Sequence, residues 1–119
     1  MEDYVKISKS DERIDIWFYN EENKPLAVGE KMYALNEEAY MNGYNWDALF
    51  MYYLTQRAPE LLIGLDSDPE AGSYVAYYER NAENEAKAQQ LAGIIVSLVE
   101  NEEELYRLVR EEGDKIQWD

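Results

Sequence analysis

The segment RIDIWFY, residues 13–19, constrains the fold more than any other, because its side chains alternate strictly between two sets. One set is apolar and the other mixed: Ile14, Ile16 and Phe18 against Asp15, Trp17 and Tyr19. A period of two in β-branched and aromatic residues is typical of a β-strand. Residues 4–8 predict a second, shorter strand, and the short polar stretch between the two predicts an antiparallel hairpin.

Two helices are expected next. Residues 20–25 have the composition of a loop, and residues 30–41 predict a helix with Met32, Leu35 and Ala39 near helical spacing. A second helix follows, with one apolar face formed by Trp46, Leu49, Phe50, Tyr53 and Leu54. Asn45 has the chemistry of its N-cap, Asp47 falls in its first turn, and Pro59 ends it.

The second half of the chain repeats this order. Residues 60–79 predict a second β unit, in which residues 61–65 and 73–78 flank the turn-forming residues 66–72. Asn81 is expected to cap a long helix with one apolar face, and Asn101 with Glu104 predicts a capping box for a last helix. Gly113 predicts its end, and residues 115–119 either add a strand or dock Trp118.

The expected order β-β-α-α-β-β-α-α predicts the α+β class, with an antiparallel sheet packed against helices. A length of 119 residues, 46% of them hydrophobic, supports one real core, so residues 1–119 are expected to form a single domain.

Composition argues against most enzyme classes. The chain has no histidine and no cysteine, and it carries no Walker A or dinucleotide-binding glycine motif. We therefore expect no catalytic residues, no cofactor and no thiolate metal site. With 11 basic and 26 acidic residues, the net charge of −15 repels nucleic acid and anionic membranes and attracts cationic partners. An acidic N-terminal segment without an apolar core is not a secretory signal, which suggests a cytoplasmic protein.

The acidic turn of residues 66–72 resembles a calcium loop only in part. Asp66, Asp68 and Glu70 alternate like ligands 1, 3 and 5. Ala71 stands in place of the required glycine, and Tyr77 stands in place of the bidentate acid. The turn is better explained by aspartates bonding to local backbone, so no metal is expected.

The run NEEELYRLVREEGD is open to two interpretations. Glu102, Glu103 and Glu104 fall in the first turn of a helix, where the helix dipole stabilises negative charge. Glu111 and Glu112 gain nothing from that effect. The run is therefore either a solvated face or a surface that meets a partner.

Eleven tyrosines are many for this length, and tyrosine serves binding surfaces as well as strands. Tyr74 and Tyr78 share one face of the expected strand, and Tyr77 lies on the other. We expect partner contacts on the acidic turn, on nearby tyrosines and at the start of the last helix: Asp66, Asp68, Glu70, Tyr74, Tyr78, Glu102 and Glu103.

Two motifs carry a resemblance to a known family. NGYNWDALFMYYLTQRAPEL followed by DSDPEAGSYVAY is similar to the pattern of the fifty-first family of polymorphic-toxin immunity proteins of bacteria. The matching residues are Asn42, Gly43, Tyr44 and Trp46, and then Asp68, Pro69, Glu70 and Ala71. Asn45 stands where an acidic residue is expected. The resemblance covers residues 40–80, about a third of the chain.

The resemblance implies a cytosolic protein that binds and neutralises a cognate toxin domain by stoichiometric inhibition. Such a toxin is expected to be basic, and a nuclease is one candidate. Two alternatives remain: an acidic mimic of nucleic acid, and a general protein-interaction or adaptor domain. The motif of residues 42–46 is expected to be structural, with Trp46 in the core, Tyr44 packed back as a clamp and Gly43 at a positive φ.

Overall fold

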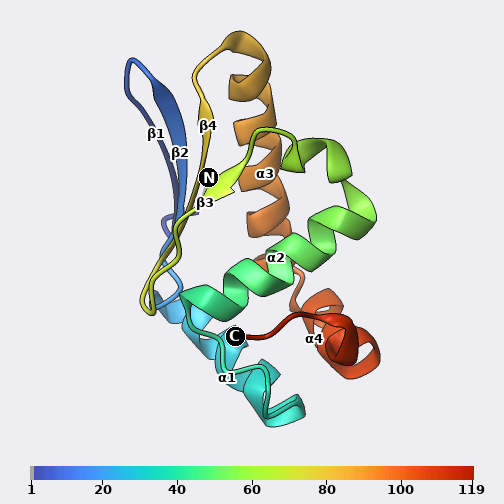
Figure 1. Cartoon of the computed structure of the whole chain (residues 1–119). Coiled ribbons are helices and arrows are strands. Elements are labelled where there is room, and N and C mark those ends of the chain that lie inside the picture. The colour runs from blue at the N-terminus through green and yellow to red at the C-terminus, as the bar shows by residue number, and fades with distance from the viewer. Residues whose placement is uncertain (1) are drawn as a thin grey trace.

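A computed structural model describes residues 2–119, and these residues contain four strands and four α-helices in the expected order (Figure 1). The strands are β1 (Val5–Lys9), β2 (Arg13–Phe18), β3 (Asp66–Ser67) and β4 (Tyr74–Glu79). The helices are α1 (Asn23–Leu35), α2 (Gly43–Arg57), α3 (Ala82–Glu100) and α4 (Glu102–Glu112). Two 3-10 turns, η1 (Pro59–Leu62) and η2 (Gly113–Lys115), complete the chain. The α+β class is confirmed.

The strands form one antiparallel sheet in the order β1-β2-β4-β3. β1 and β2 make the predicted hairpin, with Val5 opposite Phe18. β4 pairs with β2 along its whole length, so the second β unit adds to the hairpin rather than forming a separate sheet. The helices lie on one side of this sheet in Figure 1, and no helix or strand within residues 2–119 covers the other side.

The core lies between the sheet and the helices. Ile14, Ile16 and Phe18 of β2 are fully buried on this side, as their alternation predicts. α3 packs against β1, β2 and β4, and α2 packs against β4. Four aromatic rings meet in the core with centroids 5.0 to 5.6 Å apart, those of Phe18, Trp46, Phe50 and Tyr74. Trp46 is therefore a core residue, as expected.

The start of α2 differs from the prediction by three residues. The N-cap is Asn42, whose side chain accepts a hydrogen bond from the Asn45 amide. Asn45 is instead a buried residue of the first turn, 3% exposed, and its Nδ2 donates to the carbonyl of Tyr40. Because the helix begins at Gly43, Asp47 lies beyond its first turn.

Gly43 is required by close packing rather than by a positive φ, which only Gly64 has among the described residues. A Cβ at Gly43 would lie 1.8 Å from the carbonyl oxygen of Glu70 and 2.4 Å from that of Ser73. The Gly43 amide also donates to the carbonyl of Ala71 at 2.9 Å. The two motifs of the sequence thus touch each other, which explains why they occur together.

α1 lies earlier in the chain than the helix expected over residues 30–41. It begins at Asn23 and ends at Leu35, so residues 36–42 form a loop. Pro25 lies in its first turn, where a missing amide hydrogen removes no helical hydrogen bond. The apolar run of residues 61–65 is also different, because it begins within η1 and β3 starts only at Asp66.

The cap predictions for the last two helices have different outcomes. Asn81 caps α3 as predicted, accepting from the Asn84 amide. Asn101 makes no side-chain cap bond, so the predicted capping box is wrong. α4 does end before Gly113. The tail docks rather than adding a strand, and Trp118 Nε1 donates to the carbonyl of Gly113 at 2.9 Å.

Candidate partner-binding surface

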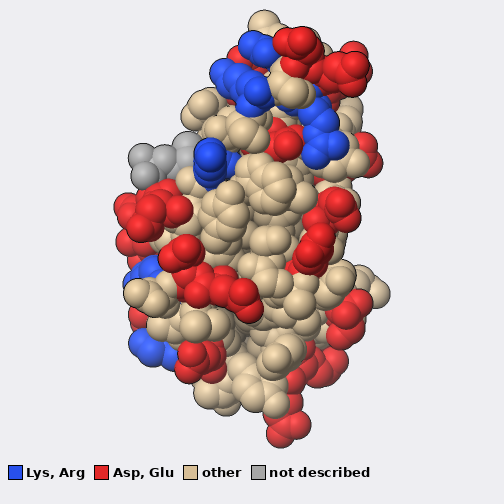
Figure 2. Space-filling view, turned by 90° about the vertical axis from the view of Figure 1, so that its left-hand side faces the viewer, with Lys and Arg blue, Asp and Glu red and all other residues tan. Residues whose placement is uncertain are grey.

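The uncovered side of the sheet, which we call the open face, presents the side chains that alternate with those of the core. They are Lys6 and Ser8 from β1, Arg13, Asp15 and Trp17 from β2, and Tyr77 and Glu79 from β4. Val75 of β4 lies on the same side but is only 6% exposed. Tyr19 follows β2, and its ring stacks on that of Trp17. Figure 2 looks onto this face.

Three half-buried aromatic rings form the middle of the open face: Trp17, Tyr19 and Tyr77. The rings of Trp17 and Tyr19 lie 6.2 Å apart and are nearly parallel, and Trp17 Nε1 donates to Ser8 Oγ at 3.2 Å. The guanidinium of Arg13 lies 3.8 Å from the centre of the Tyr77 ring. Contacts within the face hold these rings in place, so little side-chain entropy remains to be lost on binding.

Charges of both signs surround the aromatic centre. Figure 2 shows uncharged atoms in the middle, basic atoms mainly at the end above it and acidic atoms along the sides. Arg13 donates to Asp15 at 2.7 Å, and this hydrogen bond raises the pKa of the Arg13 guanidinium. At the opposite edge Asp66 of β3 pairs with Tyr77. An apolar centre with a charged rim is the usual composition of a protein–protein interface.

The predicted partner residues of the acidic turn lie on the surface. Asp66, Asp68 and Glu70 are all exposed, and they lie in and just after β3, at the edge of the sheet. Backbone hydrogen bonds hold this segment in place, since the Asp68 amide donates to the carbonyl of Val75 and Glu70 forms a β-bridge with Ser73. Their role in binding stays a prediction.

The same prediction is wrong for Tyr74 and Tyr78, which are 1% and 0% exposed and lie in the core. Tyr78 donates its hydroxyl to the carbonyl of Leu61, and burial raises the pKa of Tyr78 to about 12. Tyr77 is the outward-facing tyrosine of this strand. Trp17 and Tyr19 were also missed as surface residues, although they share the parity of Asp15, a charged residue that belongs on a solvated face.

The acidic start of α4 is engaged within the molecule. Glu102 accepts from Lys24 at 2.7 Å and lies 3.7 Å from Lys31, so it ties α4 to α1. The hydrogen bond from Lys24 lowers the pKa of Glu102. Glu103 is exposed and forms no ion pair within residues 2–119. Of these two predicted partner residues, Glu103 alone is left open to a partner.

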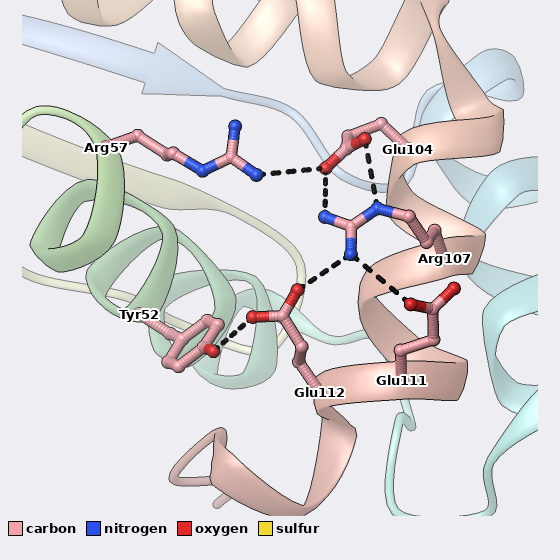
Figure 3. Close-up of polar contacts among 6 residues, drawn as sticks. All are labelled: Tyr52, Arg57, Glu104, Arg107, Glu111 and Glu112. Carbon is pink, nitrogen blue, oxygen red and sulfur yellow. Dashed lines mark hydrogen bonds and ion pairs between the residues drawn. The ribbon is translucent and has the colours of Figure 1, made fainter.

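The far end of the acidic run joins α4 to α2 (Figure 3). Arg107 donates to Glu104 at 2.6 Å and to Glu112 at 2.8 Å. From α2, Tyr52 donates its hydroxyl to Glu112, and Arg57 lies 3.7 Å from Glu104. The hydrogen bonds from Tyr52 and Arg107 lower the pKa of Glu112. These carboxylates serve helix packing, which explains acidic residues at a helix C-terminus.

The motif of residues 42–46 is part of the fold except at one position. Tyr44 is 41% exposed and does not pack back as a clamp. It lines a surface cavity of about 570 Å³ between α2 and the C-terminal tail, together with Asp47 and Trp118. Burial raises the pKa of the Asp47 carboxyl.

Within residues 2–119, no group of three or more His, Cys, Asp or Glu side chains is arranged to hold a metal ion. None of the helices in this part of the chain is long and apolar enough to cross a membrane.

Comparison with known proteins agrees with the two motifs. The model of the family described as Immunity protein 51 matches residues 5–114. No curated protein and no solved structure matches the chain. The match extends far beyond the motif residues and includes every strand and α-helix of the fold. This chain therefore belongs to the Immunity protein 51 family.

Proposed function

We propose that this protein neutralises a cognate bacterial toxin domain by binding it stoichiometrically, and that the open face is its main contact surface. The observation that carries the proposal is a sheet face that none of the described helices or strands covers and whose centre is aromatic. Trp17, Tyr19 and Tyr77 offer large rings that are already held in place, and such residues dominate binding energy in protein interfaces. Membership of an immunity-protein family supplies the class of partner.

The charge of the chain supports a basic partner. A net charge of −15 attracts a cationic protein over a distance and raises the association rate. Asp66 and Asp68 border the aromatic centre and can meet basic groups at the edge of the contact. A nuclease domain with a basic cleft suits this charge. In this proposal the protein acts in the cytoplasm, without catalysis of its own.

The alternative of a nucleic-acid mimic gains no support from this surface. A mimic needs carboxylates spaced along one face, as phosphates are along a duplex. On the open face, Lys6 and Arg13 interrupt the acidic groups, and aromatic rings occupy the middle.

The test uses a catalytically inactive variant of the toxin domain encoded beside this gene. This variant is purified and mixed with the purified protein. We expect a one-to-one complex by size exclusion and native mass spectrometry. The double variant Trp17→Ala plus Tyr77→Ala should weaken the complex by roughly 1,000-fold, since hot-spot aromatics each contribute about 2 kcal/mol or more. Tyr44→Ala removes an exposed ring elsewhere and serves as the matched control. Wild-type affinity in the double variant contradicts the open-face assignment.

The electrostatic part of the proposal is tested separately. Replacing Asp66, Asp68 and Glu70 by Asn, Asn and Gln should leave the melting temperature nearly unchanged and slow association. Raising salt from about 0.05 to 0.5 M should slow association of the wild-type protein more strongly than that of the variant, because salt screens these charges. Association that does not depend on salt contradicts the basic-partner proposal.

A further inference from the structure

A groove on α1 lies outside the open face. Leu26, Tyr33 and Tyr40 are 43%, 48% and 64% exposed and line a cavity of about 230 Å³. Asn20 and Glu21 also line this groove, and they directly follow Tyr19 of the open face. The groove and the open face are therefore neighbours along the chain. We call this feature the α1 groove.

The groove exists because α1 is apolar on two faces. Val28 and Met32 point into the core. Leu26, Gly29 and Tyr33, spaced by three and four residues, form a second face, on which Leu26 and Tyr33 are exposed and Gly29 is buried. Gly29 lets the following loop approach closely, since a Cβ there would lie 3.0 Å from the Cβ of Met41.

The two tyrosine rings of the groove are fixed against each other. Tyr33 and Tyr40 meet edge to face with centroids 5.8 Å apart. One comes from α1 and the other from the loop after it. Together they form a small aromatic wall at the surface, which attracts cations through the ring faces.

The charge around the α1 groove has one sign. Glu21 and Glu30 line it, and none of its described lining residues is basic. The two lysines of α1 are held elsewhere, because Lys24 and Lys31 both pair with Glu102. In the lower half of Figure 2, the basic atoms lie at the left margin of the view. The groove therefore combines aromatic rings, apolar walls and unneutralised carboxylates.

We propose that the α1 groove binds an arginine side chain, flanked by apolar residues, on the surface of the toxin partner. A guanidinium can stack on a tyrosine ring while donating to a carboxylate, whereas an ammonium is more strongly hydrated and offers no planar surface. The inference rests on the proposed function, and it adds a second contact that a partner on the open face can reach. Tyr33, Tyr40 and Glu30 are the residues assigned to the guanidinium.

The first test uses a peptide rather than the toxin. Acetyl-Leu-Arg-Leu-amide is titrated into the labelled protein and followed by NMR, against the same peptide with citrulline, which has nearly the same shape without the charge. We expect the arginine peptide to bind with a dissociation constant on the order of millimolar and to shift the NMR signals of Tyr33, Tyr40 and Glu30. The citrulline peptide should bind about fivefold more weakly. Equal binding of the two peptides, or shifts confined to other surfaces, overturns the inference.

Matched variants locate the site within the groove. Tyr33→Ala and Glu30→Gln should each weaken the arginine peptide by about two- to fivefold. Tyr44→Ala and Glu37→Gln remove a comparable ring and charge outside the groove, and they should bind like the wild type. If the groove variants and their controls lose the same affinity for the arginine peptide, the assignment is overturned.

The second test separates this inference from the proposed function. In complex with the toxin domain encoded beside the gene, Tyr33→Ala plus Tyr40→Ala should raise the dissociation rate by about tenfold without abolishing the complex. A wild-type dissociation rate overturns the groove inference and leaves the proposed function standing. If the wild-type protein forms no complex at all, the proposed function fails, and the peptide titration alone then decides whether the groove binds a guanidinium.

Discussion

Replacing Gly43 by alanine tests whether contact between the two family motifs holds the fold together. Gly43 is the first residue of α2, and its amide donates to Ala71 in the turn before β4. A Cβ at this position would lie 1.8 Å from Glu70 O and 2.4 Å from Ser73 O. Both are backbone atoms, so no side-chain rotation can relieve the overlap.

The cost follows from the distance that the backbone must move. The Glu70 carbonyl has to retreat from 1.8 Å to an ordinary contact near 3.4 Å. Overpacking of this kind costs about 1–3 kcal/mol, and loss of the Gly43–Ala71 hydrogen bond costs about 1 kcal/mol more. The greater helix propensity of alanine returns at most about 1 kcal/mol. We expect a net loss of about 1–3 kcal/mol in the free energy of unfolding.

Gly93→Ala is the matched control, because the same methyl group is added to another helix. Gly93 lies on the exposed side of α3, and no atom lies within 4 Å of its added Cβ. Alanine there should raise the free energy of unfolding by about 1 kcal/mol. The two substitutions are thus expected to have opposite signs.

Urea unfolding followed by circular dichroism measures both variants, and equal m-values show that the unfolding transitions are comparable. Gly43→Ala should move the midpoint down and Gly93→Ala should move it up. If Gly43→Ala is as stable as the wild type, the turn before β4 can move away from α2 without a loss of stability. The explanation of the paired motifs by rigid contact would then be wrong.

Three further outcomes are expected. Trp46→Ala should lower the free energy of unfolding by about 3–5 kcal/mol, since the ring is fully buried, and a thermal melt like that of the wild type would contradict its place in the core. Asp47→Asn should raise the melting temperature at pH 7. Burial raises the pKa of this carboxyl, so its ionised form opposes folding. The stability advantage of the amide should therefore vanish as the pH falls below that pKa. An equal advantage at pH 3 would refute the reasoning. Arg107→Gln should lower the melting temperature at low salt and lower it less at high salt, because it frees Glu104 and Glu112 from their shared cation. A salt-independent decrease would show that packing of the side chain matters more than its charge.

Local patterns in the sequence determined much of the fold. The alternation of Ile14, Ile16 and Phe18 placed β2 and its buried side, and Asn81 located the start of α3. These signals succeed because periodicity and capping act over a few neighbouring residues. The absence of histidine and the net charge of −15 likewise narrowed the function without any structure.

Tertiary contacts decided the points on which local chemistry is ambiguous. Asn42 and Asn45 both have cap chemistry, but Asn45 is occupied by the Tyr40 carbonyl and by the amide of Asp119, a residue at the end of the chain. For α1, no capping side chain marks the first turn, since Glu22 makes no cap bond. Its start depends instead on residues that pack against the rest of the molecule.

The binding surface shows the same division most clearly. The sequence determined that Tyr74 and Tyr78 share one face of β4 and that Tyr77 lies on the other. It could not determine which face is covered, because all three residues are tyrosines. Pairing with β2 decided this, since Tyr74 lies opposite Phe18 and Tyr78 opposite Ile14, on the side that the helices cover. Side-chain parity is a property of one strand, whereas coverage requires a second layer brought from elsewhere in the chain.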